Sequence, residues 1–306
     1  MNKIECFKIN IIELNDDAPM DVLSGKSIYR VQCNKIPFVL EPEVIDADPF
    51  LFVHNDRLYM FYESKTLYEP GVIRMVSTVD LKNWTDPVIV LAEPFHLSYP
   101  FVFEDDGVVY MIPESGQNHS IRLYQAEDEG LTNFRFVKDL IRRDLKTESK
   151  PSIDFCDSSI LKKDGIYYLF TSDKLSDTYR LRLFYSETLN GDYIEHPKSP
   201  IVCSNKYGRC GGSIIKGSNG LFRVAQDCQN GYGDNIHILT IEELNKESYK
   251  EHLLKKDVLP GSGFYARGGH QLNLVNYKGR IILATDAKEY HWYIMGRIYR
   301  RLKHFQ

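Results

Sequence analysis

The alternation of hydrophobic and polar positions along this chain repeats five times. In each copy a polar or small residue precedes a short apolar run, a tight polar turn follows, and a second run rich in Tyr, Phe and Ile returns to a polar end. The paired runs are 48–53 with 58–63, 99–103 with 108–114, 157–161 with 166–171, 212–215 with 221–225, and 271–275 with 280–284. A repeat of long period that is built from hairpins alone predicts blades around an axis.

The turn positions set the size of each unit. They are Asp56, Gly107, Gly165, Gly220 and Gly279, at intervals of 51, 58, 55 and 59 residues. Gly at four of the five positions fits hairpin turns that need a positive φ. After the first four hairpins a third strand is expected at 72–77, 120–125, 180–186 and 235–240, with a weaker outer strand beyond it, as at 88–91.

These features predict an all-β fold, a five-bladed β-propeller with four-stranded antiparallel blades in one domain over residues 1–306. The blades are expected at roughly 46–95, 96–150, 151–205, 206–262 and 263–306, the last closed by a segment of 1–45 that removes an exposed sheet edge. Short β-like runs stand at 27–31 and 37–40, and 290–302 is aromatic and β-prone. Only 241–249 has a pattern compatible with a short helix.

Composition narrows the class of protein. Of 306 residues, 43% are hydrophobic, with 20 Tyr and 16 Phe, which is enough to build a large core. A net charge of −4 with mixed signs gives no indication of nucleic acid or of an anionic membrane as partner. We find neither a signal-peptide pattern nor an apolar run of membrane-spanning length, so a cytoplasmic protein without membrane insertion is expected. Nothing in the sequence specifies an oligomeric state.

The cysteines and the acidic residues give no cofactor motif. Six cysteines stand irregularly at positions 6, 33, 156, 203, 210 and 228. No Cys-x-x-Cys pair indicates zinc, and free thiols in a cytosolic protein are expected. No dedicated metal-ligand spacing is present, so the sequence predicts neither a metal nor another cofactor.

Hairpin geometry predicts where a functional site lies. The start of the first strand lies beside the end of the second, so two sets of positions should ring one mouth of the central channel. They are Asp48, Tyr99, Asp157, Gly212 and Gln271, and then Glu63, Glu114, Ser172, Asp227 and Asp286. Acids crowded in a concave pocket have perturbed pKa values and can support acid–base chemistry. The alternative is that these acids only accept backbone hydrogen bonds or are solvated.

Several of these segments resemble known families. Residues 47–50, the Tyr-rich return strand and 77–85 resemble the first blade of the five-bladed-propeller glycoside hydrolases of family 43. Residues 96–104, 110–115, 226–233 and 268–271 are more similar to the N-terminal propeller domain of plant glucosamine inositolphosphorylceramide transferases and its bacterial homologues. The resemblance covers roughly residues 40–290 and implies a propeller with a carbohydrate ligand.

The family 43 resemblance implies roles for three positions. Asp48 matches the general base at the head of blade one, and Asp157 matches the residue of blade three that orients the acid. Gly212 stands where blade four of that family has its acidic Glu, and a glycine cannot protonate a leaving oxygen. Glu114 and Asp227 are therefore the replacement acids that we expect, with His270 as a third candidate because imidazole titrates near neutral pH.

Sugar binding requires aromatic faces and planar polar groups. Residues of these types at predicted strand heads or in adjoining loops are Tyr99, Arg209, Gln226, Tyr232, Tyr265, Arg267, His270 and Gln271. Trp84, in an outer-strand loop, is expected to pack, and the third-strand arginines Arg74, Arg122 and Arg182 are expected to be structural.

Two functions of different class remain open. The first is an enzyme that acts on a glycosidic linkage by inverting-type carboxylate chemistry, which the Asp48–Asp157 pair favours. The second is a non-catalytic glycan-binding or accessory module in cytoplasmic polysaccharide or glycolipid assembly, which the missing blade-four Glu favours. A protein-interaction propeller would show aromatic or charged patches on the opposite rim, and the sequence has no such bias. We expect the enzyme.

Overall fold

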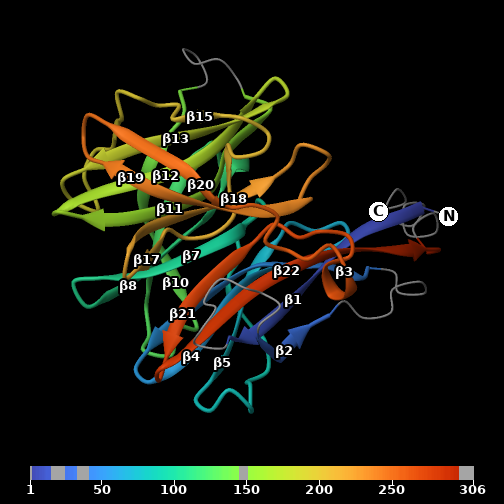
Figure 1. Ribbon diagram of the computed structural model, residues 1–306. Helices are drawn as coiled ribbons and strands as arrows, with labels where there is room; N and C mark the ends of the chain where they lie inside the picture. Colours follow the sequence, from blue (N-terminus) through green and yellow to red (C-terminus); the bar gives the residue numbers. More distant parts are fainter. Residues whose placement is uncertain (1, 15–24, 33–40, 145–150, 296–306) are drawn as a thin grey trace.

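The computed structural model describes residues 2–14, 25–32, 41–144 and 151–295 (Figure 1). Within them the chain is all-β apart from two single-turn 3₁₀ helices, η1 (Gly116–Asn118) and η2 (Gly263–Tyr265), as the sequence predicts. The run expected at 37–40 and the end of the 290–302 segment, from residue 296, lie outside the described residues. No helix in the described part of the chain has the length and apolar character needed to cross a membrane.

Three sheets follow the chain order. The first consists of β7 (Ser98–Asp105), β8 (Val108–Glu114), β9 (Ser120–Ala126) and β10 (Phe134–Arg142). The next contains β11 (Ile153–Lys163), β12 (Ile166–Leu175), β13 (Thr178–Ser186), β14 (Ile194–Glu195) and β15 (Val202–Cys203). The third contains β16 (Arg209–Cys210), β17 (Ile215–Gly217), β18 (Gly220–Asp227), β19 (Asn235–Leu244) and β20 (Tyr249–Lys255). All their strand pairs are antiparallel.

The remaining strands form one larger sheet of two antiparallel units. One unit contains β3 (Glu43–His54), β4 (Arg57–Thr66), β5 (Val72–Thr78) and β6 (Val88–Leu91). The other contains β21 (Leu272–Tyr277), β22 (Arg280–Tyr293), β1 (Asn2–Glu13) and β2 (Lys26–Val31). β1 runs beside β22 over its whole length, so the N-terminal segment extends the sheet of the last hairpin (Figure 1). A single parallel pair, Phe7 with Ile45, joins the two units.

The first strands of the hairpins lie next to one another. β3 contacts both β21 and β7, and β11 contacts both β7 and β16. Apolar clusters fill the spaces between neighbouring sheets; for example, Phe61 of β4 meets Phe134 of β10 edge to face at a ring distance of 5.9 Å. Trp84 stacks on Tyr29 with ring centroids 4.5 Å apart, which confirms its packing role.

The hairpin turns confirm the expected backbone conformation. Each of the five turn positions has a positive φ, from 57° at Asp56 to 140° at Gly220. A Cβ atom added at Gly107, Gly165, Gly220 or Gly279 would meet no atom within 4 Å. The positive φ alone therefore explains these glycines.

The short helix compatible with 241–249 does not form. β19 continues to Leu244, and Ile241 pairs with Leu221 on one side and with Glu251 on the other. A tight turn follows, in which the Asn245 side chain accepts the backbone N–H groups of Glu247 and Ser248. Ladder bonds on both edges of the strand override the weak helical pattern.

Candidate functional site

β-Bulges shape the heads of the first strands. The pairing register shifts between Ala47 and Phe50, between Ser98 and Phe101, and between Cys156 and Ser159. Within these shifts Asp48, Tyr99 and Asp157 have left-handed φ values of 51°, 44° and 55°. Bulges re-aim side chains and are common beside active sites, and non-glycine residues in this region carry strain. The three equivalent positions found by counting from the turns therefore share one unusual backbone geometry.

A cavity of about 480 Å³ opens at this end of the molecule. Ala47 pairs with Glu63 and Ser98 with Glu114, which brings both glutamates to the same end as Asp48. The cavity lining draws on both halves of the large sheet and on two other sheets. Its charged and aromatic members are Phe7, Asp48, Glu63, Lys65, Tyr68, Glu69, His96, Glu114, Arg209, Tyr232 and His270.

Asp157 lies behind this lining and is bound by two side chains. Arg209 Nε donates to Asp157 Oδ2 at 2.5 Å, and Gln226 Nε2 donates to the same oxygen at 3.1 Å. The Arg209 guanidinium lies over the rings of Tyr179 and Tyr232, at 5.3 and 4.8 Å. Arg209 and Gln226 thus first serve to fix Asp157, and Arg209 alone of the two also reaches the cavity.

Asp48 is almost fully buried. Its Oδ2 accepts the Tyr99 backbone N–H at 3.1 Å, and its Oδ1 lies 3.4 Å from His270 Nε2. Burial raises the pKa of Asp48 to about 7, with His270 opposing the rise and the negative charge of Asp157 adding to it. An Asp with this pKa exchanges protons near neutral pH, as a general base must.

Two glutamates share the cavity with Asp48. Burial raises the pKa of Glu114 well above its usual range; the nearby Asp157 adds to the rise, while Arg209, whose Nη2 lies 3.9 Å from Glu114 Oε2, opposes it. Burial likewise raises the pKa of Glu63, helped by the charges of Asp48 and Glu114. Burial therefore favours the protonated form of both side chains.

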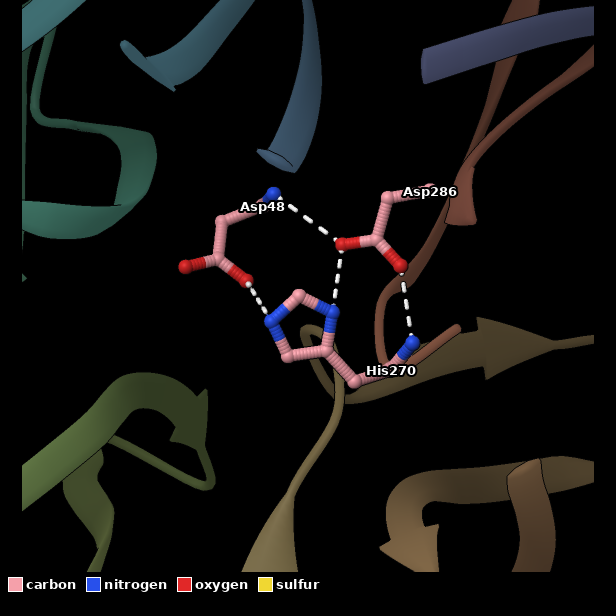
Figure 2. A group of neighbouring side chains, drawn as sticks. All are labelled: Asp48, His270 and Asp286. Atoms are coloured by element: carbon pink, nitrogen blue, oxygen red, sulfur yellow. Dashed lines mark hydrogen bonds and ion pairs between the residues drawn. The ribbon is translucent and has the colours of Figure 1, made fainter. Parts of the chain in front are cut away.

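Opposite these glutamates, His270 stands between two aspartates. Its Nδ1 lies 2.6 Å from Asp286 Oδ2, and Figure 2 shows the ring directed from Asp286 toward Asp48. Burial lowers the pKa of His270, but the charges of Asp286 and Asp48 outweigh this effect and the pKa lies above its ordinary value. The rings of Phe7 and Tyr232 enclose the imidazole at 4.6 and 4.9 Å.

His96, in the loop between β6 and β7, also lines the cavity but differs from His270 in its protonation. Its Nδ1 accepts the Gly71 backbone N–H at 3.0 Å, so the neutral ring carries its proton on Nε2, 3.4 Å from Glu63 Oε1. Burial lowers the pKa of His96 to about 4. His96 is consequently a neutral donor at neutral pH.

Other candidates from the sequence lie away from the cavity. Asp227 accepts from His237 Nε2 at 3.0 Å and from the Gln229 N–H, outside the lining. Tyr265 uses its hydroxyl on Thr285, and Arg267 lines a separate cavity of about 390 Å³ with Lys288.

Two of the predicted sugar contacts are inside the protein. The Tyr99 hydroxyl donates to the Gly212 carbonyl oxygen at 2.7 Å. Gln271 is fully buried, and neither of its side-chain amide atoms has a hydrogen-bond partner among the described residues. Neither side chain is part of the cavity lining.

Packing explains why position 212 is a glycine. A Cβ at Gly212 would overlap with the Leu272 carbonyl oxygen, and at the neighbouring Gly211 it would lie 2.9 Å from the His270 carbonyl oxygen. The segment that contains Gly212 lies so close to the start of β21 that no acidic side chain fits at position 212. The residue that the family 43 resemblance assigns as acid is excluded by the backbone itself.

Counting from the turns misses the cavity residues that come from loops, from strand ends and from β1. Phe7 comes from β1, and Lys65, His96 and Gln117 come from strand ends and loops outside the repeat. His96 is part of the segment that carries the family resemblance, which is the only signal in the sequence for it.

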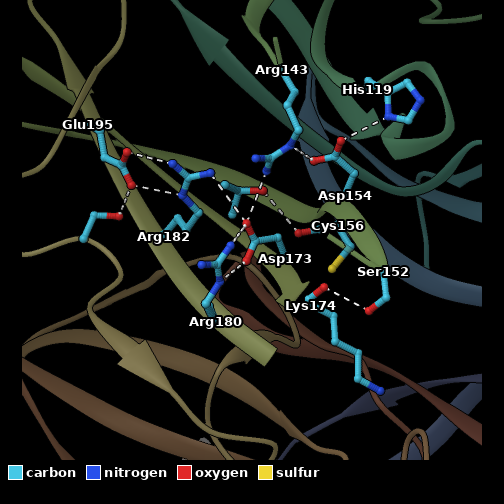
Figure 3. Close-up of polar contacts among 12 residues, drawn as sticks. His119, Arg143, Ser152, Asp154, Cys156, Asp173, Lys174, Arg180, Arg182 and Glu195 are labelled. Carbon is cyan, nitrogen blue, oxygen red and sulfur yellow. Dashed lines mark hydrogen bonds and ion pairs between the residues drawn. The ribbon is translucent and has the colours of Figure 1, made fainter. Parts of the chain in front are cut away.

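The third-strand arginines form ion pairs away from the cavity. Arg74 pairs with Glu43 at 2.7 Å and Arg122 with Glu93 at 3.0 Å. Arg182 pairs with Glu195 at 2.7 Å, and Figure 3 shows it in a network around the buried Asp173. This supports the structural role expected of them.

Among the described residues, three clusters could offer three metal ligands each. They are Asp48 with His270 and Asp286, Glu114 with Cys156 and Asp157, and Asp227 with His237 and Asp257. In the first, the Asp286 oxygens already accept three backbone N–H groups. In the second, Arg209 binds Asp157, and in the third, His237 Nδ1 accepts the Asp257 N–H. Hydrogen bonding accounts for these clusters, and we propose no metal in them.

Most of the chain matches a known protein family. Residues 28–262 match the family model described as glucosamine inositolphosphorylceramide transferase 1, N-terminal. The rice (Oryza sativa subsp. japonica) protein of that name is 37% identical over 218 residues, which cover 69% of this chain and 28% of the rice protein. The Arabidopsis thaliana protein is 37% identical over 213 residues, which cover 67% and 26%. The matched region thus spans about a quarter of the curated relatives.

Solved structures with a similar fold include glycoside hydrolases. A family 117 enzyme from Zobellia galactanivorans has a TM-score of 0.55 at 13% identity and covers 84% of this chain and 89% of its own. A family 32 β-fructofuranosidase from Bombyx mori has a TM-score of 0.57 at 15% identity, covering 83% and 57%. A family 43 protein from Bacillus licheniformis has a TM-score of 0.52 at 19% identity, covering 69% and 42%. At these identities the likeness establishes the fold alone.

Proposed function

This chain belongs to the glucosamine inositolphosphorylceramide transferase 1 N-terminal family, and from this premise we propose that its cavity acts on a glycosidic linkage by carboxylate acid–base chemistry. In this proposal Asp48 is the general base, Glu114 is the general acid, and Asp157 orients the acid. The substrate is a carbohydrate.

The proposal includes the architecture that places these groups. Support comes from the described residues, which form three antiparallel sheets of four or five strands and a larger sheet of two antiparallel units, one of which includes β1 and β2. We infer five blades of one domain over residues 1–306, with the heads of their first strands around one channel mouth. The parallel pair between β1 and β3 supports this arrangement, because it joins the unit that contains β21 and β22 to the unit that contains β3 and β4.

The observation that carries the function is that two buried carboxyls with raised pKa, those of Asp48 and Glu114, line one cavity. The pKa of Asp48 is raised to about 7, so a large fraction is ionised at neutral pH, whereas the pKa of Glu114 is raised well above its usual range. In the proposal these two carboxyls supply the base and the acid that glycoside hydrolysis needs.

The reaction then follows from where the protons lie. In an inverting mechanism Asp48 takes a proton from a water that attacks the anomeric carbon, while Glu114 gives its proton to the leaving oxygen. Asp157 lies beside Glu114, with ligand atoms of the two within 4.8 Å of each other. Because Arg209 binds Asp157, the Asp157 carboxylate is held in one orientation toward the acid.

A glycan-binding or accessory module is the second candidate function. It is favoured by the packing at Gly212, which leaves no room for the acid of family 43, and by relatives that are named as transferases. In such a module the same cavity would hold a sugar without cleaving it, and polysaccharide or glycolipid assembly would be its setting.

One screen separates the two functions. The wild-type chain and Asp48→Asn are each incubated with one panel of glycans and aryl glycosides, with binding and hydrolysis read on the same samples. We expect hydrolysis by the wild type and its loss in Asp48→Asn with binding retained. Binding without cleavage by the wild type supports the accessory module, and neither binding nor cleavage contradicts both functions.

A further inference from the structure

We propose that Asp286 is a positioning residue that fixes His270 beside Asp48, and that His270 exchanges a proton with the Asp48 carboxyl. This inference rests on the proposed function, because Asp48 is the base in that function. In this inference His270 accepts the proton that Asp48 has removed from water.

The Asp286 carboxylate binds backbone groups of two segments that are far apart in the sequence. Its Oδ2 accepts the Asp48 backbone N–H at 3.2 Å, and its Oδ1 accepts those of His270 at 2.7 Å and Gln271 at 3.1 Å. The side chain is fully buried on β22. Asp48 of β3 and His270 before β21 are therefore positioned by one carboxylate, as Figure 2 shows.

The same carboxylate selects the protonation of the His270 ring. Nδ1 lies 2.6 Å from Asp286 Oδ2, and because a carboxylate oxygen accepts, Nδ1 carries a hydrogen. Nε2 then faces Asp48 Oδ1 at 3.4 Å. The ring is 2% exposed and lies between Phe7 and Tyr232, so little water competes for Nε2.

Asp48 presents one free oxygen to this nitrogen. Oδ2 accepts the Tyr99 N–H, whereas Oδ1 is buried and has no hydrogen-bond partner among the described residues. In the exchange a proton leaves Asp48 Oδ1 and binds His270 Nε2, and no other bond changes. The product is an imidazolium between two carboxylates, whose negative charges stabilise it against the cost of burial.

The charged groups around His270 and Asp48 determine whether the pKa of Asp48 rises or falls when Asp286 is neutralised. His270 faces Asp286 from β22, Asp48 from β3 and Arg209 from β16. Asp48 also faces Asp157 from β11, and Glu63 from β4 lies close to it. The attraction between His270 and the Asp48 carboxylate exceeds the direct repulsion from Asp286. Neutralising Asp286 should therefore raise the pKa of Asp48, because His270 loses its proton more readily.

Nuclear magnetic resonance titration of the sugar-free protein tests the inference. Side-chain ¹⁵N signals of His270 and the ¹³C carboxyl signal of Asp48 are followed against pH in the wild type and in Asp286→Asn. We expect Asp286→Asn to lower the pKa of His270 and to raise that of Asp48. Asp227→Asn is the matched control, since Asp227 pairs with the buried His237 at 3.0 Å outside the cavity. It should leave both titrations where they are.

A second variant keeps the test decisive if Asp286→Asn fails to fold. His270→Gln removes the titrating ring and should raise the pKa of Asp48 directly. An unchanged Asp48 titration in His270→Gln, or an unchanged His270 titration in folded Asp286→Asn, overturns the inference. Because no sugar is present, a negative result in the glycoside screen would contradict the proposed function without affecting this measurement.

Discussion

The hydroxyl of Tyr99 donates a hydrogen bond to the carbonyl oxygen of Gly212 at 2.7 Å. Both residues occupy the same position in the repeat, eight residues before the turn, in the second and the fourth copies. One of them thus contributes a side chain and the other only its backbone, and both are buried. The bond makes position 212 part of the core that joins two units, which is a different use of this position from that of a catalytic acid.

Gly212→Ala should destabilise the protein although alanine is small. Its Cβ would overlap with the Leu272 backbone oxygen, which cannot move aside as a flexible side chain would. We expect a loss of about 1–3 kcal/mol in the free energy of unfolding, as for other overpacked sites. Urea unfolding followed by tryptophan fluorescence measures it.

Gly130→Ala provides the comparison for that experiment. Gly130 is exposed, and the nearest atom to its Cβ would be Asp128 Oδ1 at 3.1 Å, a contact that a shift of a few tenths of an ångström in this exposed turn would relieve. Its free energy of unfolding should stay within about 0.5 kcal/mol of the wild type. Equal stability of Gly212→Ala and Gly130→Ala would mean that position 212 has room for a side chain.

How much of this site the sequence predicts depends on the kind of residue. The period of the repeat locates Asp48, Glu63, Glu114 and Asp286 at one end, because the hairpin register fixes which positions lie side by side. It cannot show which way a side chain turns once there. Asp227 belongs to the same set by counting, yet its carboxylate turns to His237.

The residues that come from outside the repeat could not be found by counting. Phe7 reaches the cavity because β1 pairs with β22, which is a contact between the two ends of the chain. His96 is fixed by a hydrogen bond from Gly71 in another loop. Such contacts depend on tertiary packing, and no local pattern encodes them.

Glu114→Gln and Asp227→Asn should separate the two acids that the sequence suggests. Glu114 lines the cavity, so Glu114→Gln should lower turnover of glycosides with poor leaving groups by about 10²–10⁴-fold, the usual contribution of a general acid. Aryl glycosides with good leaving groups should restore part of the rate, since they need no protonation. Asp227→Asn should retain turnover; the reverse result would assign the acid to Asp227.

Stability should depend on pH through Asp48. Its pKa is about 7 in the folded protein and near 3.9 in an unfolded chain, so between these values the folded state binds more protons than the unfolded state. The free energy of unfolding should therefore fall as pH rises from about 4 to about 7, by an amount on the order of a few kcal/mol. Turnover should rise over the same range, as the base becomes ionised.

Asp48→Asn isolates this contribution from other titrating groups. The amide cannot ionise, so the variant should gain stability relative to the wild type as pH increases from 5 to 8. Urea unfolding at both pH values gives the difference directly. A stability difference that stays constant from pH 5 to pH 8 would show that Asp48 titrates at an ordinary carboxyl pKa.

The Arg209–Asp157 pair should be costly to break and much less costly to remove as a whole. Its side chains are only 9% and 1% exposed, so Arg209→Gln leaves a buried carboxylate without its counter-charge, with an expected loss of about 3–5 kcal/mol in the free energy of unfolding. Adding Asp157→Asn to that variant removes the unpaired charge, and we expect most of the loss to be recovered. Urea unfolding of both single variants and the double variant gives the coupling energy.

The exposed Lys246–Glu187 pair, treated in the same way, should show little coupling. Additive losses at Arg209 and Asp157 would mean that each is held by its other partners, and that Arg209 does not fix the orientation of Asp157 beside Glu114.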